Sequence, residues 1–333
     1  MSVKQDVLTK LEHSRGQFFS GEELARELDV SRTAVWKAIK QLEVEGYEIH
    51  AVPNKGYCLS LNTDVISTEG IRASLLKEWK DCAITTYKET GSTNQNAKLA
   101  AAEGAEHGSL FVAEAQTNGR GRRGRVFETP KGNGIYMSIL LKPQMEAADA
   151  IYMTTAASVA VRRAIKKVTG KETLIKWVND LYFEEKKVCG ILTEAVTDIQ
   201  TGMVDSIILG IGINFNMPED AFSEEIKHVA GSLYHGENVE VTRNQLVAEI
   251  FNQVMELCMN KDDRSFIEEY KKYSFILGEE IVILSADGNI PAKAVDITDF
   301  GGLVVELLDG TRKTISSGEV SIRKQSMVKD KNA

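Results

Sequence analysis

One segment of this sequence concentrates residues that can bind an anion. Residues 116–125 read Gln-Thr-Asn-Gly-Arg-Gly-Arg-Arg-Gly-Arg, with four arginines and three glycines. Glycine lets a backbone approach a ligand closely, and arginine binds phosphate oxygens through paired hydrogen bonds. Because four like charges repel one another, we expect the segment to be poorly ordered until an anion neutralises it. Composition supports this hypothesis and a solvated or nucleic-acid-binding loop about equally.

Two common nucleotide motifs are excluded for this segment. Gly119, Gly121 and Gly124 match the dinucleotide pattern GxGxxG, but that motif needs a helix to begin at its last glycine. The residues that follow, 125–134, include a proline and two further glycines and are typical of a loop. No GxxxxGK[ST] motif occurs either, so we expect neither a Rossmann site nor a P-loop.

A second candidate is Lys176, which lies in an otherwise apolar predicted strand. Alternation places it on one face with Leu174 and Val178, so the lysine can point inward. A buried lysine usually needs a carboxylate or phosphate partner. The polar pair that follows, Asn179 and Asp180, is typical of a hairpin turn.

From about residue 80, strands that alternate with helices are predicted to hold both candidates. An alanine-rich helix follows Ser92, which matches a capping box with Gln95; a plain cap explains this pair better than a ligand site does. A long helix is predicted over about 148–168, and Gly210–Asn216 ends the sheet with small residues that allow close backbone approach. The predicted strands are Ile84–Tyr87, Leu110–Glu114, Gly134–Leu141, Val188–Val196 and Met203–Ile211.

Residues 1–63 form a separate predicted unit of three helices and two strands. Apolar spacing predicts a first helix over the first eleven residues, a capping box at Ser20 opens the second, and Ser31 caps the third. Strands at 47–52 and 57–61 enclose a turn. This order resembles a winged helix-turn-helix, whose second paired helix enters the DNA major groove.

The third helix has a charge pattern suited to DNA. From Val30 to Leu42 there are three basic residues and no acidic one, and such a face can contact phosphates. A protein–protein module is the alternative. Because one such domain makes few contacts, we expect a dimer on two half-sites. The predicted DNA contacts are Ser31, Arg32, Thr33, Trp36, Lys37, Lys40 and, in the wing, Lys55.

Composition limits the remaining classes. The 333 residues, 43% hydrophobic, indicate a globular protein of two or three domains. The net charge of −8 argues against non-specific coating of nucleic acid but not against a local basic patch. No apolar run reaches the roughly 20 residues that span a bilayer, and no signal peptide is recognisable. Four separated cysteines predict neither disulfides nor a zinc site. We expect a cytoplasmic protein without a structural transition metal.

The C-terminal part is predicted to be a small β-barrel. A helix begins near Thr242, where Gln245 completes a capping box, and another covers 265–273. From Gly278 onward, short strands are separated by Asp-Gly and Gly-Gly turns. Residues 324–333 are expected to be frayed.

Four motifs that occur in order resemble the biotin protein ligase family: Gly91–Gln95, Gln116–Arg125, Lys176–Asp180 and Gly210–Asn214. With the winged helix in front, the chain resembles the bifunctional form that also represses the biotin operon. The similarity spans nearly the whole sequence. Two positions depart from the family pattern, because Val178 replaces the usual proline and Phe127 stands where some members have tryptophan against the nucleotide.

The resemblance implies an α+β multidomain fold. Residues 1–63 would be a winged helix-turn-helix DNA-binding domain, 64–273 a mixed α/β catalytic domain of the biotin/lipoate ligase type, and 274–333 an SH3-like β-barrel. It also implies two chemical steps, in which ATP converts biotin to biotinyl-5′-AMP and a lysine of a carboxylase carrier domain then attacks. The implied cofactors are ATP, biotin and Mg²⁺. The implied partners are a biotin carboxyl carrier domain, operator DNA and a second copy of the chain, which dimerises on adenylate and DNA binding, with no membrane.

The resemblance assigns roles to individual residues. Lys176 and Arg122 are the predicted catalytic residues. Biotin binding is implied for Ser92, Thr93, Asn94, Gln116, Arg120, Gly121, Arg122 and Lys176. Nucleotide binding is implied for Arg120, Arg122, Arg123, Arg125, Asn179 and Asn214.

Three other functions stay open on the sequence. A biotin-sensing repressor without ligase activity is disfavoured because Lys176 and the arginine-rich segment are intact. A lipoate-type ligase would use the same fold, and the choice of acid would separate it from a biotin ligase. A nucleotide-dependent dehydrogenase is disfavoured because no helix is predicted after Gly124.

Overall fold

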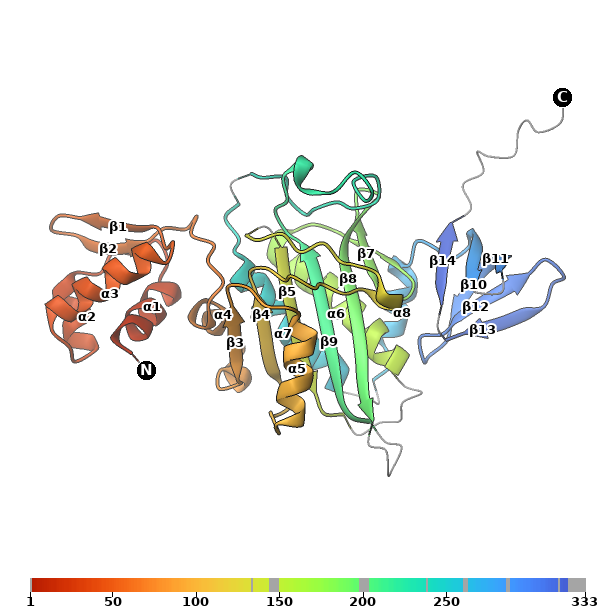
Figure 1. Cartoon of the computed structure of the whole chain (residues 1–333), viewed down its shortest axis with the longest axis horizontal. Helices are drawn as coiled ribbons and strands as arrows, with labels where there is room; N and C mark the ends of the chain where they lie inside the picture. Colours follow the sequence, from red (N-terminus) through yellow and green to blue (C-terminus); the bar gives the residue numbers. More distant parts are fainter. Residues whose placement is uncertain are drawn as a thin grey trace.

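The computed structural model describes residues 2–132, 134–143, 150–197, 204–237, 239–259, 263–285, 288–316 and 318–322. Three bodies lie in a row along the long axis (Figure 1). A helical N-terminal body is followed by a central body around a seven-stranded sheet and by a C-terminal body with a five-stranded sheet. The predicted start of the long helix at 148 and the predicted frayed end, 324–333, lie outside the described residues.

The N-terminal body confirms the predicted winged helix. Ser20 forms a capping box with Glu23, and Ser31 Oγ accepts a hydrogen bond from Ala34 N, as predicted. Apolar side chains from all three helices, among them Val7, form a core separate from that of the central body. The elements are α1 (Val3–His13), α2 (Gly21–Glu27), α3 (Arg32–Val44), β1 (Ile49–Val52) and β2 (Gly56–Leu59).

The wing formed by β1 and β2 depends on Gly56. This residue has a φ of 100°, a left-handed conformation that glycine adopts at little cost. The backbones of Phe19 and Tyr57 exchange hydrogen bonds of 2.9 and 2.8 Å, which tie the wing to the segment before α2. A Cβ on Gly56 would lie only 2.0 Å from Phe19 O, so this close approach requires glycine.

The central sheet is mostly antiparallel. Its strand order is β3-β4-β5-β9-β8-β7-β6, and β3 with β4 is the parallel pair. Helices follow β3 and β5, whereas β6 to β9 are neighbours in both sequence and space, so the predicted alternation holds only in the first part. The strands are β3 (Ile84–Tyr87), β4 (Ser109–Ala113), β5 (Gly134–Leu141), β6 (Leu174–Lys176), β7 (Asp180–Phe183), β8 (Lys186–Thr197) and β9 (Val204–Asn214).

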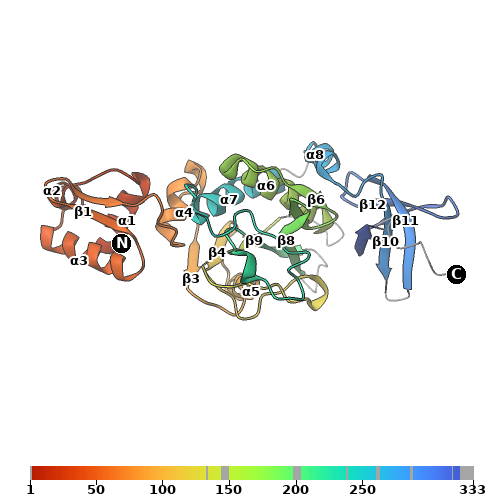
Figure 2. The ribbon, with the colours of Figure 1, turned by 90° about the horizontal axis from the view of Figure 1, so that it is seen from above.

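Helices cover both faces of this sheet (Figure 2). α5 (Thr93–Ala102) packs on one face, and α6 (Ala150–Thr169) with α7 (Arg243–Met259) packs on the other. Side chains of β9 therefore alternate between two cores: Ile207 belongs to the core with α6 and α7, and Ile208 packs with Ala97 of α5. Strands buried on both faces are rigid, and they are what holds the site in place.

Two shorter connections complete the chain. α4 (Thr68–Ser74) and the 3-10 turn η1 (Lys77–Trp79) follow the N-terminal body, and α4 contacts both α1 and α7. α8 (Phe266–Tyr273) packs on α6 and leads into the C-terminal body.

The C-terminal body is an antiparallel sheet of order β13-β12-β11-β10-β14. It docks on the central body, where Trp177 Nε1 donates a hydrogen bond of 2.9 Å to Gly301 O. Its buried side chains, among them Ile281, continue the large central core. The strands are β10 (Glu280–Ser285), β11 (Gly288–Ile297), β12 (Leu303–Leu307), β13 (Arg312–Ile315) and β14 (Glu319–Ile322).

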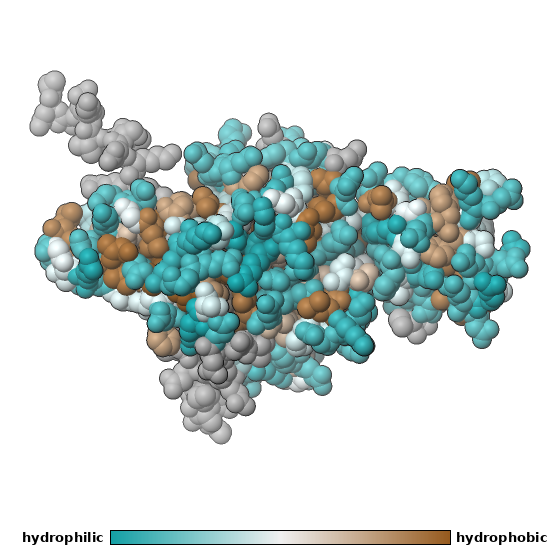
Figure 3. Space-filling view, turned by 180° about the vertical axis from the view of Figure 1, so that it is seen from behind, coloured by the Kyte–Doolittle hydropathy of each residue, from teal (hydrophilic) through white to brown (hydrophobic). Residues whose placement is uncertain are grey.

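The surface seen from behind is mostly hydrophilic, with apolar side chains in separate patches (Figure 3). Among the described residues, no helix combines the length and the apolar character needed to cross a membrane.

We expect Gly56→Ala to lower the free energy of unfolding by about 3 kcal/mol, because it combines a left-handed φ with a backbone clash. Urea unfolding of the full chain, followed by circular dichroism, measures this change. Gly104→Ala is the control, since Gly104 has a φ of 90° but no atom lies within 4 Å of a Cβ placed there, and it should cost only about 1 kcal/mol. Equal losses in the two variants would contradict the role assigned to the Phe19 contact.

Candidate active site and DNA-binding surface

A cavity opens beside the N-terminus of α5, on the sheet face that this helix covers. Its floor is made by Gly190 of β8 and by Gly210 and Gly212 of β9. The two β9 glycines share a face with Ile208 because strand residues alternate, and Gly190 pairs with Gly212. Because these three positions have no side chain, Asn94 and Phe127 can lie directly against the backbone at the floor. The predicted site residues that line the cavity are Ser92, Thr93, Asn94, Gln116, Arg120, Gly121, Arg122, Arg125, Lys176 and Asn179.

The N-terminus of α5 is capped by a distant side chain. Ser92 is the N-cap residue, but its side chain makes no capping hydrogen bond, so the predicted capping box with Gln95 is wrong. Instead, Gln116 Oε1 accepts hydrogen bonds from Thr93 N at 2.7 Å and from Thr93 Oγ1 at 3.1 Å. The tertiary contact replaces the local one, and it joins two segments that line the cavity.

A partly buried polar network fixes the next residue of α5. Asn94 Nδ2 donates to Glu194 at 2.7 Å, and Asn94 Oδ1 accepts from Ser138 Oγ at 2.6 Å. Lys98 Nζ lies 2.6 Å from the other oxygen of Glu194. A Cβ on Gly210 would lie 2.2 Å from Asn94 Oδ1, so the glycine floor is also what admits this side chain.

The arginine-rich segment is a closed loop beside the cavity. Gly121 N donates to Arg125 O at 2.8 Å and Phe127 N donates to Gly119 O at 3.1 Å, around the short turn η2 (Arg122–Gly124). Arg122 Nη1 donates to Asn179 Oδ1 at 3.2 Å, which ties the loop to the turn after β6. Further ordering of this loop by an anionic ligand stays a prediction.

Phe127 lies over the glycine floor. A Cβ on Gly212 would be 2.7 Å from Phe127 Cε1, and one on Gly190 would be 3.2 Å from Phe127 Cε2. The neighbouring Glu128 accepts hydrogen bonds from Ser223, which follows the short turn η4 (Glu219–Ala221). The aromatic ring is therefore placed to stack on a planar group that enters the cavity from above the floor.

Lys176 is the last residue of β6 and lines the cavity, and hydrogen bonds from Ser158 and Tyr270 hold the turn that follows. The turn covers residues 177–179, so the predicted Asn179–Asp180 turn is shifted and Asp180 begins β7. The Trp177–Val178 peptide is cis, and Val178 O accepts from Ser158 Oγ at 3.3 Å and from the Tyr270 hydroxyl at 3.2 Å. Burial holds the pKa of Tyr270 well above its usual range, so this hydroxyl stays a donor.

Positive charge dominates the cavity lining. Arg120, Arg122, Arg125, Lys176 and Lys187 face it, against a single lining carboxylate among the described residues. That carboxylate belongs to Asp180, whose Oδ1 lies 2.7 Å from Lys187 Nζ. Fixed cations of this kind can hold two anionic groups together and stabilise negative charge that develops during a reaction.

One predicted nucleotide contact, Asn214, is not brought to the cavity. Asn214 is buried and donates through Nδ2 to Gly231 O at 2.8 Å, so its amide holds the chain after β9. The side chain of Arg123 lies outside the described part of the structure. Sequence reasoning also missed Ser138, Glu194 and Lys187, because each acquires its role from a partner on another element.

The predicted DNA contacts are all exposed residues of the N-terminal body. Arg32, Thr33 and Trp36 line a groove between α3 and the wing, and 51% of Trp36 is exposed. Lys37 and Lys40 are exposed on the same helix. Lys40 Nζ lies 2.6 Å from Glu43 Oε2. Ser31 caps the helix, and in the wing Lys55 Nζ lies 5.9 Å from the ring centre of Phe18. Polar, cationic and aromatic groups on an exposed helix are typical of a surface that reads a DNA groove, and contact of these residues with DNA stays a prediction.

Three family models match successive parts of the chain. Residues 3–58 match an HTH domain, 87–214 match the Biotin/lipoate A/B protein ligase family, and 276–323 match the Biotin protein ligase C terminal domain. The solved biotin protein ligase from Aquifex aeolicus in complex with biotin and ATP is 32% identical, with a TM-score of 0.61, and it covers 73% of this chain and 99% of its own. The fold and the site thus define a protein ligase of the biotin/lipoate class that carries a helix-turn-helix.

Proteins that are similar to this chain over nearly its whole length identify the family within this class. The bifunctional ligase/repressor BirA of Bacillus spizizenii is 34% identical over 95% of this chain and 98% of its own length. That of Escherichia coli K12 is 28% identical over 93% of this chain and 94% of its own. The chain belongs to the bifunctional ligase/repressor family.

Proposed function

We propose that this chain activates biotin with ATP, transfers it to a lysine of a carboxylase carrier domain, and acts as a biotin-responsive transcriptional repressor. The observation that carries the proposal is the cavity. All eight residues predicted to bind biotin line it, from Ser92 to Lys176, and three of them are among its five cationic side chains.

The chemistry follows from the charges. Biotin enters as a carboxylate and ATP as a polyanion, so the two repel each other unless fixed cations neutralise both. A carboxylate oxygen of biotin attacks the α-phosphorus, the bond to the β-phosphate oxygen breaks, and pyrophosphate leaves. Lys176 would contact the carboxylate and the α-phosphate, and Arg122 would stabilise the charge that builds up between them.

The second step uses the same positions. The amine of the carrier lysine attacks the carbonyl carbon of the mixed anhydride, loses a proton, and releases AMP. Biotin would be held by Ser92, Thr93, Asn94 and Gln116, whose positions are fixed by the Gln116 cap and the Asn94 network. Among the nucleotide contacts we keep Arg120, Arg125 and Asn179, whereas Asn214 would act only through the chain it holds.

Mg²⁺ fits this site as a partner of the ATP phosphates. In the described ranges, no three His, Cys, Asp or Glu side chains gather into a metal site, and Asp180 is the lining carboxylate. Mg²⁺ is commonly held by one or two carboxylates with substrate phosphates, where it neutralises charge. Asp180 is therefore the residue that we expect beside it.

The repressor function rests on the groove between α3 and the wing. We propose that the chain dimerises on binding adenylate and DNA, because two winged helices on two half-sites bind far more tightly than one.

The domain limits 1–63, 64–273 and 274–333 and the cytoplasmic location stay predictions.

Two alternatives have distinct outcomes. A repressor without ligase activity would bind biotin but release no pyrophosphate from ATP. A lipoate-type ligase would label a carrier with lipoate in preference to biotin. Parallel incubations with ATP and either labelled acid separate both alternatives from the proposal.

We expect Lys176→Ala to reduce adenylate formation roughly 100- to 1000-fold, because it removes a fixed charge at the reacting groups. Biotin-dependent exchange of pyrophosphate into ATP measures this step. Lys313→Ala, an exposed lysine on β13, is the control and should exchange at the wild-type rate. Wild-type exchange in a folded Lys176→Ala protein would refute the assignment.

Gly210→Ala should abolish biotin binding, because its Cβ would displace Asn94 from the floor of the cavity. Isothermal titration with biotin measures the loss. Gly91→Ala is the matched control, since no atom lies within 4 Å of a Cβ at that position. If both variants bind biotin equally, Asn94 does not have the place in the biotin site that we propose.

Biotin and ATP together should slow tryptic cleavage within Gly119–Arg125 at least about fivefold, because neutralised arginines become ordered around the ligand. Mass spectrometry of timed digests locates the cuts. Cleavage at exposed Lys313 serves as the internal control. An unchanged rate within the loop would show that it is not a lid ordered by ligand.

A further inference from the structure

Arg243, at the first position of α7, is buried where a cation would normally be unfavourable. Its side chain is only 3% exposed, and a helix N-terminus repels positive charge. Burial by itself lowers the pKa of Arg243, but the carboxylates of Asp64 and Glu114 reverse the shift and raise it. The arginine is therefore held in place by its partners and not by the helix.

Those partners come from three separate segments. Arg243 Nε donates to Asp64 Oδ2 at 2.8 Å, Nη1 donates to Glu114 Oε2 at 2.7 Å, and Nη1 also lies 3.2 Å from Gly134 O. The backbone N of Arg243 donates to Asp64 Oδ1 at 2.8 Å. We call Arg243, Asp64 and Glu114 the Arg243 cluster.

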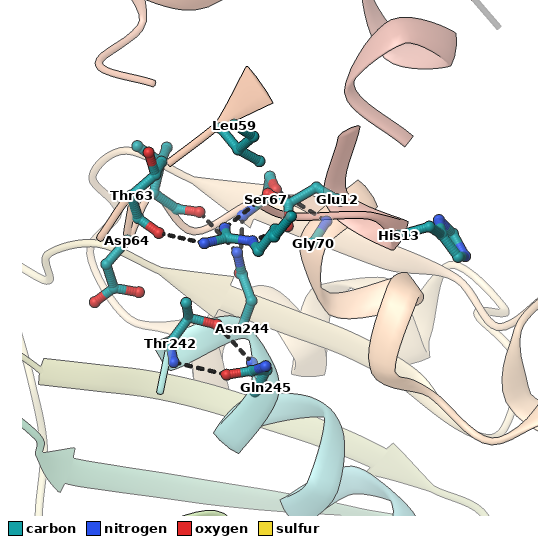
Figure 4. A network of polar contacts seen from close by, with 12 residues as sticks. Glu12, His13, Leu59, Thr63, Asp64, Ser67, Gly70, Thr242, Asn244 and Gln245 are labelled. Atoms are coloured by element: carbon teal, nitrogen blue, oxygen red, sulfur yellow. Dashed lines mark hydrogen bonds and ion pairs between the residues drawn. The ribbon is translucent and has the colours of Figure 1, made fainter. Parts of the chain in front are cut away.

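The same region clamps the connection between the two bodies (Figure 4). Glu114 accepts from Ile66 N at 2.9 Å, while Asn244 donates to Val65 O at 2.8 Å and accepts from Ser67 N at 3.1 Å. Every residue from Asp64 to Ser67 is thus fixed through its backbone by the central body.

On the other side, the N-terminal body holds the preceding residue. Arg15 Nη1 donates to Thr63 O at 2.7 Å, and Arg15 is paired with Glu12 at 2.7 Å. Arg243 Nη2 donates to Asp64 O, the next carbonyl along the chain. Arginines of two different bodies therefore hold adjacent carbonyls, and the N-terminal body also contacts the chain beyond this point, because Val65 packs against its core and α1 contacts α4.

The cluster also adjoins the cavity. Glu114 is two residues before Gln116, which caps α5, and Gly134 is two residues before Tyr136, which lines the cavity. The hydroxyl of Tyr136 donates to Pro130 O at 2.9 Å, in the segment that follows the arginine-rich loop. Gln116 follows β4 and Tyr136 lies in β5, and each of these lining residues is two positions along the chain from a residue that contacts Arg243.

We propose that Arg243 is a positioning residue through which occupancy of the cavity sets the orientation of the winged helix. This inference rests on the proposed function, because the ligand in the cavity is taken to be biotin with ATP. Binding shifts Gln116 and Tyr136, the Arg243 cluster transmits the shift to Asp64–Ser67, and this segment, which also contacts the N-terminal body through Val65, reorients the DNA-binding body. Without the cluster, the two bodies would respond to their ligands separately.

Hydrogen–deuterium exchange of the full chain tests this proposal without knowledge of the operator. In the wild type, biotin with ATP should slow exchange about tenfold both in cavity peptides around Thr93 and Gln116 and in peptides that contain Ile66 and Ser67. In Asp64→Asn, the cavity peptides should keep this response and the Ile66–Ser67 peptides should lose it. Glu249→Gln, a carboxylate on α7 that pairs with Lys167, should behave as the wild type.

The outcomes separate the two proposals. Cavity protection without any change at Ile66–Ser67 in the wild type would overturn the coupling but leave the proposed function intact. No ligand-dependent protection anywhere would overturn the proposed function itself. A full linker response in Asp64→Asn would show that the cluster is merely structural. Pyrophosphate exchange at the wild-type rate in Asp64→Asn would support a role confined to coupling.

Discussion

Repulsion between two anions is the constraint on which this structure depends. A carboxylate and a triphosphate have to meet in one cavity. Among the described residues that line this cavity, five have cationic side chains and one has a carboxylate. Arginines so close together repel one another, so they are carried on a glycine-rich loop, while Lys176 comes from the end of a strand. The charge of Lys176 is therefore fixed by the sheet, whereas ordering of the arginines around a ligand stays a prediction.

The fixed part needs a rigid frame that still leaves space. A sheet covered by helices on both faces supplies rigidity, and three glycines on its inner face make room for Asn94 and Phe127 at the floor of the cavity. Support comes from behind the reacting groups: Tyr270 and Ser158 hold Val178 O, and Trp177 contacts Gly301 of the C-terminal body. Two strands of this sheet also contact the Arg243 cluster, because Glu114 follows β4 and Gly134 begins β5. The sheet that shapes the cavity is therefore connected through this cluster to the DNA-binding body.

Local signals explain why much of the fold was predictable. Ser20, Ser31 and Thr242 cap helices as their spacing predicts, and the apolar runs of β5 and β9 lie where the pattern places them. Contacts between distant residues were not predictable. Gln116 caps α5 in place of the predicted Ser92–Gln95 pair, and Asn214 donates to Gly231 O. Arg243 pairs with Asp64 and Glu114, which are both far away in sequence. The residue types suggest the chemistry, but only packing determines which partners meet.

The most direct test incubates the full chain with ATP, labelled biotin and a carboxylase carrier domain. We predict label on one lysine of the carrier, in proportion to the pyrophosphate and AMP released, and no transfer when ATP is omitted. Replacement of the acceptor lysine in the carrier by arginine should leave pyrophosphate release but abolish labelling. Binding of biotin with neither pyrophosphate release nor labelled carrier would contradict the account.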